Sequence, residues 1–161
     1  MAGKLVAYFS ASGVTEVLAK RLAQAAGADL FEIEPEVAYA EADLNWQDKT
    51  ARSTVEMADK TFRPAISATS KACDMAAYDE VFVGFPIWWY VAPTIVNTFL
   101  EAYDLAGKKI ALFATSGSSG MGKTLEELKP SAPGAVWVGE KRFSASAGAD
   151  ELAAWAQSLG M

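Results

Sequence analysis

Continuous apolar runs alternate along the chain with stretches of helical periodicity. Runs typical of strands buried on both faces of a sheet occupy residues 5–9, 30–33, 80–85, 109–114 and 135–138. Apolar residues recur at the spacing of one helix face over residues 14–26, 93–102, 124–129 and 150–159. Gly27 and Pro130 are placed to end two of these helices. Strands that alternate with helices predict an α/β fold, a parallel sheet covered on both faces.

Residues 36–78 depart from this alternation. The segment is mostly polar, and its main apolar residues are Trp46, Val55, Met57, Phe62 and Ile66. A connection of this length without structure would be unusual inside a compact domain. We therefore expect a helix over about residues 48–59, with extended segments wrapped over one face of the sheet.

Length and composition exclude several classes of protein. A chain of 161 residues predicts a single domain over residues 1–161. It has no histidine and one cysteine, Cys73, which excludes an internal disulfide, cysteine-cluster metal sites and His-based nucleophilic catalysis. We predict no metal site and no catalytic residue of the chain's own.

The charge balance bears on partners and on location. Asp and Glu outnumber Lys and Arg by 20 to 14, for a net charge of −6, which argues against nucleic acid and anionic membranes as partners. The most apolar run, residues 81–96, is too short and too interrupted to span a bilayer. Nothing in the first ten residues resembles a signal peptide, so we expect a cytoplasmic protein.

The loop that follows the first strand is suited to an anion. Ligands of open parallel sheets bind beyond the carboxyl ends of the strands. Residues 10–15 supply three hydroxyl groups, a glycine and the start of a helix, whose free N–H groups and dipole favour a phosphate. No Lys or Arg lies between Lys4 and Lys20, so N–H and O–H donors alone would hold it. The alternative is an ordinary helix N-cap.

Two further loops follow strands at the same expected edge. Residues 85–93 carry the consecutive aromatics Trp88, Trp89 and Tyr90 between two prolines, which favours stacking on a flat ligand. The alternatives are a patch for a partner protein or a plug beneath the long connection. Residues 115–122 are nearly all small, so that their backbone can approach a ligand closely and donate N–H groups to it. The alternative is a flexible turn between a strand and a helix.

The third loop also contains a nucleotide-binding pattern. Residues 117–124 match G-x-x-x-x-G-K-[ST], after a predicted strand and before a predicted helix. Phosphoryl transfer also needs a Mg²⁺-binding carboxylate at the end of another strand, but the first and third strands lead into Ser10 and Phe85. Nucleotide binding through residues 117–124 is therefore kept as an alternative.

Taken together, residues 8–15, 85–89 and 114–117 resemble the three cofactor loops of the flavodoxins and flavodoxin-like FMN proteins, in their short-chain form. The resemblance implies a flavodoxin-like sandwich with a five-stranded parallel sheet of order 2-1-3-4-5, which brings the three loops together. It implies FMN as cofactor, with residues 10–15 on the phosphate and residues 86–90 and 115–120 beside the flavin ring. The predicted cofactor-binding residues are Ser10, Ala11, Ser12, Gly13, Val14, Thr15, Pro86, Ile87, Trp88, Trp89, Tyr90, Thr115, Ser116, Gly117, Ser118 and Gly120.

The expected function is electron transfer between redox partner proteins, with FMN carrying one or two electrons. The acidic surface favours partners with basic docking surfaces, although solubility explains the acidity equally well. The alternative is an NAD(P)H-dependent FMN quinone reductase, which needs an open flavin face and a basic pocket. Near the three loops the sequence offers Lys123 alone.

Overall fold

A five-stranded parallel sheet forms the centre of the computed structural model, which describes residues 3–11, 13–45, 47–89, 91–115 and 120–161. The strand order is β2-β1-β3-β4-β5, and all neighbouring strands are parallel. This confirms the predicted fold class. The strands are β1 (Gly3–Tyr8), β2 (Asp29–Glu32), β3 (Tyr78–Pro86), β4 (Lys109–Thr115) and β5 (Val136–Phe143).

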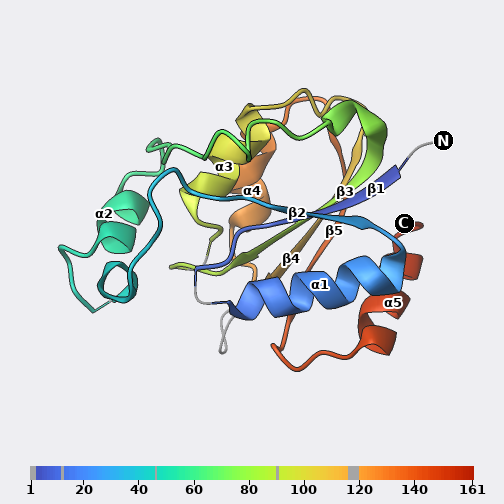
Figure 1. Cartoon of the computed structure of the whole chain (residues 1–161), viewed down its shortest axis with the longest axis horizontal. Coiled ribbons are helices and arrows are strands. Elements are labelled where there is room, and N and C mark those ends of the chain that lie inside the picture. Colours follow the sequence, from blue (N-terminus) through green and yellow to red (C-terminus); the bar gives the residue numbers. More distant parts are fainter. Residues whose placement is uncertain (1–2, 12, 46, 90, 116–119) are drawn as a thin grey trace.

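Helices cover both faces of the sheet (Figure 1). The helices α1 (Val14–Ala26) and α5 (Ala149–Ser158) pack on one face, and α3 (Thr94–Glu101) and α4 (Thr124–Leu128) pack on the other. The short helix α2 (Arg52–Ala58) stands apart, beyond the carboxyl ends of the strands. Single 3-10 turns lie at Glu41–Leu44, Met75–Ala77 and Lys129–Ser131.

Two apolar layers hold the helices to the sheet. Leu18, Leu22 and Trp155 pack with Phe82 and Phe113 beneath α1 and α5. On the other face the fully buried residues are mainly large and aliphatic or aromatic, and include Phe9, Phe85, Ile95, Phe99 and Leu112. Burial of each such side chain stabilises the fold by about 1.5–3 kcal/mol. Gly84 is required in β3, because a Cβ there would lie 2.1 Å from the ring of Phe113.

The edge strand β5 is longer than the sequence pattern predicts. It was expected over residues 135–138, but it pairs with β4 as far as the partners Thr115 and Phe143. Glu140 and Lys141 are exposed there, because an edge strand keeps charged side chains in water. These charges interrupt the apolar run on which the shorter prediction rested, and the longer strand carries Lys141 and Arg142 to the carboxyl edge.

Residues 36–65, here called the extension, leave the sheet and return to it at one point. Pro35 and Ile66 form an antiparallel bridge, with Glu36 N–H donating to the Ala65 carbonyl at 2.9 Å. Ser67 N–H donates to the Glu34 carbonyl at 2.8 Å. The helix of the extension covers Arg52–Ala58, fewer residues than the predicted 48–59. Beyond the carboxyl ends of the strands, the extension therefore forms a closed loop.

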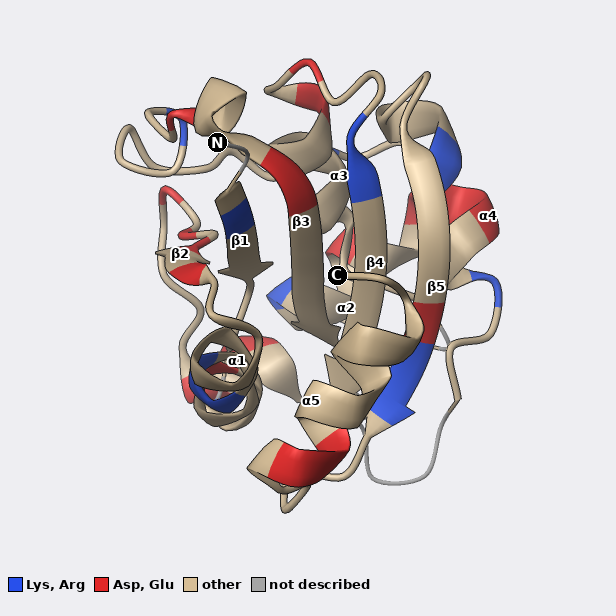
Figure 2. Cartoon of the chain, turned by 90° about the vertical axis from the view of Figure 1, so that its right-hand side faces the viewer, with Lys and Arg blue, Asp and Glu red and all other residues tan. Residues whose placement is uncertain are grey.

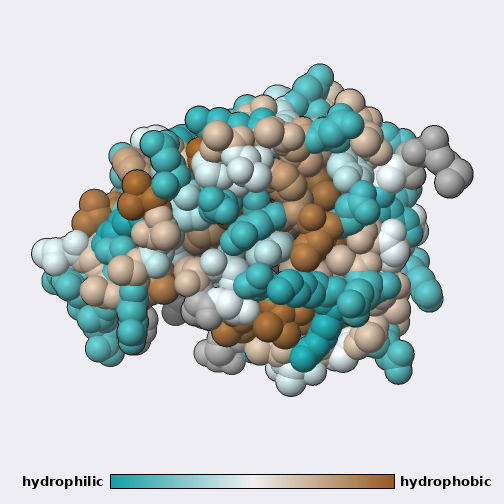
Figure 3. Space-filling view, in the orientation of Figure 1, coloured by the Kyte–Doolittle hydropathy of each residue, from teal (hydrophilic) through white to brown (hydrophobic). Residues whose placement is uncertain are grey.

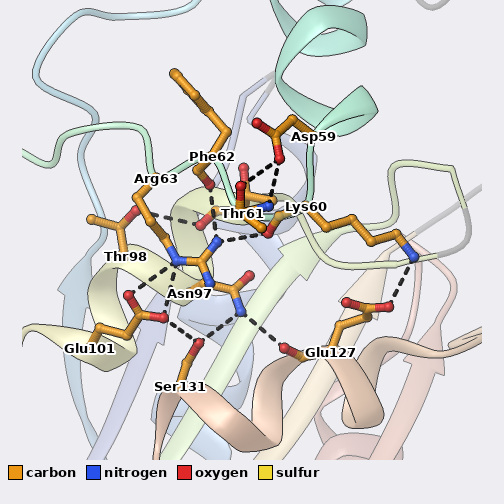
Figure 4. A network of polar contacts seen from close by, with 11 residues as sticks. Asp59, Lys60, Thr61, Phe62, Arg63, Asn97, Thr98, Glu101, Glu127 and Ser131 are labelled. Carbon is orange, nitrogen blue, oxygen red and sulfur yellow. Dashed lines mark hydrogen bonds and ion pairs between the residues drawn. The ribbon is translucent and has the colours of Figure 1, made fainter.

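A polar network ties the returning arm of the extension to the α3 and α4 side of the sheet (Figure 4). Arg63 Nε donates to both carboxylate oxygens of Glu101, at 3.0 and 3.1 Å, and Lys60 pairs with Glu127 at 2.9 Å. The buried Asn97 amide donates to the Glu127 carbonyl at 3.1 Å and to Ser131 Oγ at 2.9 Å. Individual exposed ion pairs contribute little, but this network joins four segments at a partly buried position.

Candidate functional site

The loop between β1 and α1 ends in an exposed helix N-terminus. Gly13 adopts the left-handed conformation, with φ 91°, and its N–H donates to Ser10 Oγ at 3.0 Å. No described side chain caps α1, so its first N–H groups depend on a partner outside the helix. The positive end of the helix dipole lies at the same place. Ser10, Gly13, Val14 and the start of α1 therefore form a donor set that fits an anion; Ser12 lies outside the described residues.

Thr115, at the end of β4, joins the three predicted loops. Its Oγ1 lies 2.8 Å from Oγ1 of Thr15, which is 2% exposed in the first turn of α1. The Thr115 carbonyl accepts a hydrogen bond of 3.1 Å from the Ile87 N–H of the loop after β3. Residues far apart in the chain thus meet at the carboxyl edge, because strands β1, β3 and β4 are neighbours in the sheet.

The loop after β3 holds a tryptophan in a disfavoured conformation. Trp88 and Val91 exchange two backbone hydrogen bonds, of 2.9 and 3.2 Å, around a tight turn. Trp89 in this turn has φ +48°, the one positive value among described residues other than glycine. Bulky residues rarely adopt this region, and such strain is concentrated at functional sites. The Trp89 side chain is 41% exposed, so it is available to a ligand.

Trp88 is placed differently from its neighbour. Its indole ring is half-buried and makes edge contacts with two other rings, at 5.7 Å from Phe9 and 5.5 Å from Tyr39. Ile87 packs against the same apolar layer, and Pro86 ends β3. Of the two tryptophans, Trp89 is the one presented to solvent. Tyr90 lies outside the described residues.

The third loop is described only at its two ends. Thr115 is buried and Gly120 is exposed, whereas Ser116, Gly117 and Ser118 lie outside the described residues. Further along, the Thr124 hydroxyl donates to the Met121 carbonyl at 2.5 Å, and Thr124 is fully buried. In the nucleotide-binding pattern this hydroxyl would face a metal ion, but here it is used within its own turn. The described part of residues 117–124 thus supports a strand-to-helix turn.

Carboxylates gather on one side of the α1 N-terminus. Burial, followed by the neighbouring charges of Glu16 and Glu34, raises the pKa of Glu32 above its usual value. Burial and the charges of Glu32 and Glu16 likewise raise the pKa of Tyr8. Glu16 is paired with Lys20 at 3.3 Å. This side of the site therefore disfavours additional negative charge.

Positive charge lies on the other side of the edge. Lys141 and Arg142 occupy the carboxyl end of β5, next to the strand that leads into the third loop (Figure 2). Sequence reasoning missed them because it ended the strand at residue 138. The basic pair Lys141-Arg142, followed by the apolar Phe143, was the signal that could have extended the strand.

Among the described residues, no group of three or more His, Cys, Asp or Glu side chains could hold a metal ion. No helix within the described ranges is long and apolar enough to cross a membrane.

Comparisons with known proteins agree with this geometry. The chain is similar over its whole length to a candidate flavoprotein of Bacteroides eggerthii DSM 20697, with 41% identity, a TM-score of 0.92 and 99% of that chain covered. A candidate flavoprotein of Bacteroides uniformis ATCC 8492 is 44% identical over 97% of this chain and 98% of its own, with a TM-score of 0.90. A flavoprotein of Lactobacillus acidophilus NCFM, solved in complex with FMN, shares the fold at 23% identity, with a TM-score of 0.66 and coverage of 88% and 93%.

No curated protein matches the chain. The family model of the flavodoxins matches residues 3–159, nearly the whole chain. The chain belongs to the flavodoxin family.

Proposed function

We propose that this protein binds FMN at the carboxyl edge of its sheet and transfers electrons between redox partners. The observation that carries the proposal is the meeting of the three loops at Thr115. An uncapped helix N-terminus, buried hydroxyls and an exposed, strained tryptophan lie on segments joined there by hydrogen bonds of 2.8 and 3.1 Å. The family membership and the FMN complex of the Lactobacillus acidophilus relative support the same cofactor.

The phosphate of FMN would be held by the α1 N-terminus. Its donors would be the Ser10 and Thr15 hydroxyls and the backbone N–H groups that follow Gly13, aided by the helix dipole. The open left-handed Gly13 leaves room for an anion, because no described atom lies within 4 Å of the position of a Cβ. Ser12 stays a predicted residue of the phosphate site, and Ser116, Gly117 and Ser118 stay predicted residues beside the flavin ring.

The flavin ring would lie beside Trp89. Bound FMN supplies one- or two-electron chemistry, and the protein controls its surroundings. Trp89 would exclude water from one side of the ring, and the charges of Glu16, Glu32 and Glu34, which lie beside the α1 N-terminus, would oppose the added negative charge of reduction. We expect these carboxylates to lower the reduction potential of the bound cofactor relative to FMN in water.

Titration of the purified protein with FMN and with riboflavin tests the proposal. FMN is expected to bind with quenching of flavin fluorescence and a shift of its visible absorption bands. Riboflavin lacks the phosphate and is expected to bind at least about tenfold more weakly, which corresponds to the loss of roughly 1.4 kcal/mol of anion binding. Equal affinities would contradict a phosphate site at α1, and an unchanged flavin spectrum would contradict the proposal as a whole.

A second candidate function is supported by one feature of the fold. An NAD(P)H-dependent quinone reductase needs cationic side chains near the flavin, and β5 brings Lys141 and Arg142 to the same edge as the third loop. A steady-state assay of the FMN-loaded protein with NADH, NADPH and a quinone separates the two candidates. Electron transfer between partners predicts negligible turnover without an added reductase, whereas rapid turnover would favour the reductase.

A further inference from the structure

Tyr39 connects the extension to two of the three loops. Its ring centroid lies 5.7 Å from that of Phe9, which directly precedes Ser10, and 5.5 Å from that of Trp88, which directly precedes Trp89. Phe9 and Trp88 are themselves 5.7 Å apart. All three pairs meet edge to face, with interplanar angles of 66° to 86°. These rings, called here the aromatic triangle, come from the residue that follows β1, from the extension and from the loop after β3.

A buried carboxylate fixes the position of the Tyr39 ring. The Tyr39 hydroxyl donates to Glu56 Oε1, and Glu56, at 6% exposure, also accepts a 2.9 Å hydrogen bond from Arg52 Nε. The Arg52 guanidinium carbon lies 3.8 Å from the Tyr39 ring centroid, and its Nη1 donates to the Val37 carbonyl at 2.7 Å. A buried carboxylate needs such partners to remain charged. Tyr39 is therefore held on three sides. Arg52 packs on the face of its ring, Glu56 binds its hydroxyl, and Phe9 and Trp88 contact the ring edge to face.

Burial and the hydrogen bond to Glu56 raise the pKa of Tyr39 well above its usual value, so that its hydroxyl stays protonated and continues to donate. The ring that faces Trp88 is thus neutral over the physiological range of pH.

The turn that follows Trp88 needs support. Trp89 adopts φ +48°, and a disfavoured conformation of this kind persists only where the surrounding structure imposes it. One side of the turn is fixed by the backbone hydrogen bonds between Trp88 and Val91. The Trp88 side chain is further supported by packing against the apolar core layer and by its two edge contacts, one of which Tyr39 provides.

From this geometry we propose that Tyr39 is a positioning residue of the cofactor site, which acts through Trp88 to hold the turn that presents Trp89. The extension is then a part of the flavin site that the three loops alone do not supply. The expected effect of Tyr39 on FMN binding rests on the proposed function, whereas the effect of Tyr39 on Trp88 does not depend on any ligand.

The competing explanation is that Tyr39, Glu56 and Arg52 only anchor α2 to the rest of the chain. An anchor would change the stability of the extension without any specific dependence on Trp88. A double-mutant cycle separates the two explanations, since residues that act through one another show non-additive effects. The extension also offers a matched control, Phe62, an aromatic residue that points into solvent (Figure 4).

The experiment compares Tyr39→Leu, Trp88→Leu and the double variant, with Phe62→Leu as the control. We expect Tyr39→Leu to weaken FMN binding about tenfold, as loss of an edge-on aromatic contact implies, and to reduce the quenching of flavin fluorescence. In the Trp88→Leu background, Tyr39→Leu should have little further effect. Phe62→Leu should bind FMN with the affinity of the wild type. Additive losses in the cycle, or unchanged binding by a folded Tyr39→Leu, would overturn the proposal.

Two milder variants and one ligand-free measurement complete the test. Tyr39→Phe keeps the ring and should restore most of the affinity, whereas Glu56→Gln, which removes the charge that holds the ring, should fall between Phe and Leu. These variants decide the matter if Tyr39→Leu does not fold. Near-UV circular dichroism of the FMN-free protein should show an altered tryptophan signal in Tyr39→Leu and not in Phe62→Leu. If the wild type does not bind FMN, the proposed function fails, and the tryptophan signal alone then supports or overturns the role of Tyr39.

Discussion

The two ends of the sheet differ in how far the protein satisfies its own polar groups. At the amino end, Tyr78 donates to Asp29 at 2.7 Å, and Lys108 Nζ donates to the Tyr78 carbonyl at 2.6 Å. At the carboxyl end, α1 begins without a side-chain cap and Trp89 lies exposed in a strained turn. These groups of the amino end are paired within the chain, although one buried carboxylate oxygen of Glu80 there has no described partner. The carboxyl end presents N–H donors and an exposed ring to a ligand.

The surface pocket at the amino end does not change the assignment of the ligand site to the carboxyl end. A pocket of about 520 Å³ lies at the amino end and includes Cys73, Tyr103 and Lys108 in its lining. Burial and the charge of Asp74 raise the pKa of the Cys73 thiol, which makes it a poor nucleophile. The proposed site therefore rests on the uncapped N-terminus of α1 and on the exposed Trp89, and not on the volume of a pocket.

The sharpest test of the comparison is a matched pair of glycines. Gly13 at the carboxyl end and Gly107 at the amino end have φ of +91° and +79°, and no described atom lies within 4 Å of a Cβ built on either. Alanine at each position should destabilise the fold by about 1 kcal/mol. Gly13→Ala should in addition weaken FMN binding by roughly 10- to 100-fold, the effect of one or two lost hydrogen bonds to a charged group.

Chemical denaturation and fluorescence titration measure the two effects separately. Equal loss of FMN affinity in Gly13→Ala and Gly107→Ala would remove the distinction between the ends.

A second pair compares hydroxyl groups. Thr115→Val leaves the buried Thr15 hydroxyl without its 2.8 Å partner, which should destabilise the fold by about 1–3 kcal/mol and weaken FMN binding. Tyr78→Phe removes an exposed hydroxyl from the amino end and should change stability by about 0.5 kcal/mol or less. Thermal unfolding with and without FMN gives both values. If Tyr78→Phe were the more damaging change, the amino end would have to be considered the more constrained one.

The carboxylates beside α1 give a smaller, pH-dependent effect. The pKa of Glu32 is raised in the folded state, so its contribution to stability is present at low pH and is lost as pH rises through that value. Glu32→Gln is therefore expected to stabilise the protein at pH 7 by a few tenths of a kcal/mol, about the size of an exposed charge interaction, and not at pH 4. Glu36→Gln serves as the control. A gain that persisted unchanged at pH 4 would exclude charge repulsion as its cause.

The smallest expected effect is at the amino end. Cys73→Ala should leave the affinity for FMN and the flavin spectrum unchanged, since Cys73 lines the pocket at the end away from the three loops. A change in either measurement would link the two ends of the sheet and would call for a reassignment of that pocket.

The sequence pattern predicted the parts of the fold that repeat. Five apolar runs and four helical stretches led to the observed order of elements, because strands buried on both faces carry continuous apolar residues. It failed for the carboxyl end of β5, where an edge position allows charged side chains. It also failed for most of the extension, whose path depends on individual side-chain hydrogen bonds such as that of Arg52 to the Val37 carbonyl.

The sequence predicted that three loops share one edge of the sheet, but not how their side chains are arranged. The described parts of the hydroxyl-rich loop and of the aromatic run do lie at the carboxyl edge. Which tryptophan faces solvent depends on a backbone angle at Trp89 that no periodicity encodes. Tyr39 was not predicted, because its role arises from contacts with Phe9 and Trp88 that are distant in the chain.

The bridge between Pro35 and Ile66 has a consequence for how this protein can diverge. Because the intervening stretch departs and returns at a single place, insertions or deletions within it need not disturb any strand pairing. The space-filling view shows this lobe as a protrusion of mixed polar and apolar character (Figure 3). Related chains can therefore exchange this lobe as a unit, and with it the ring that braces Trp88, while they inherit the same scaffold.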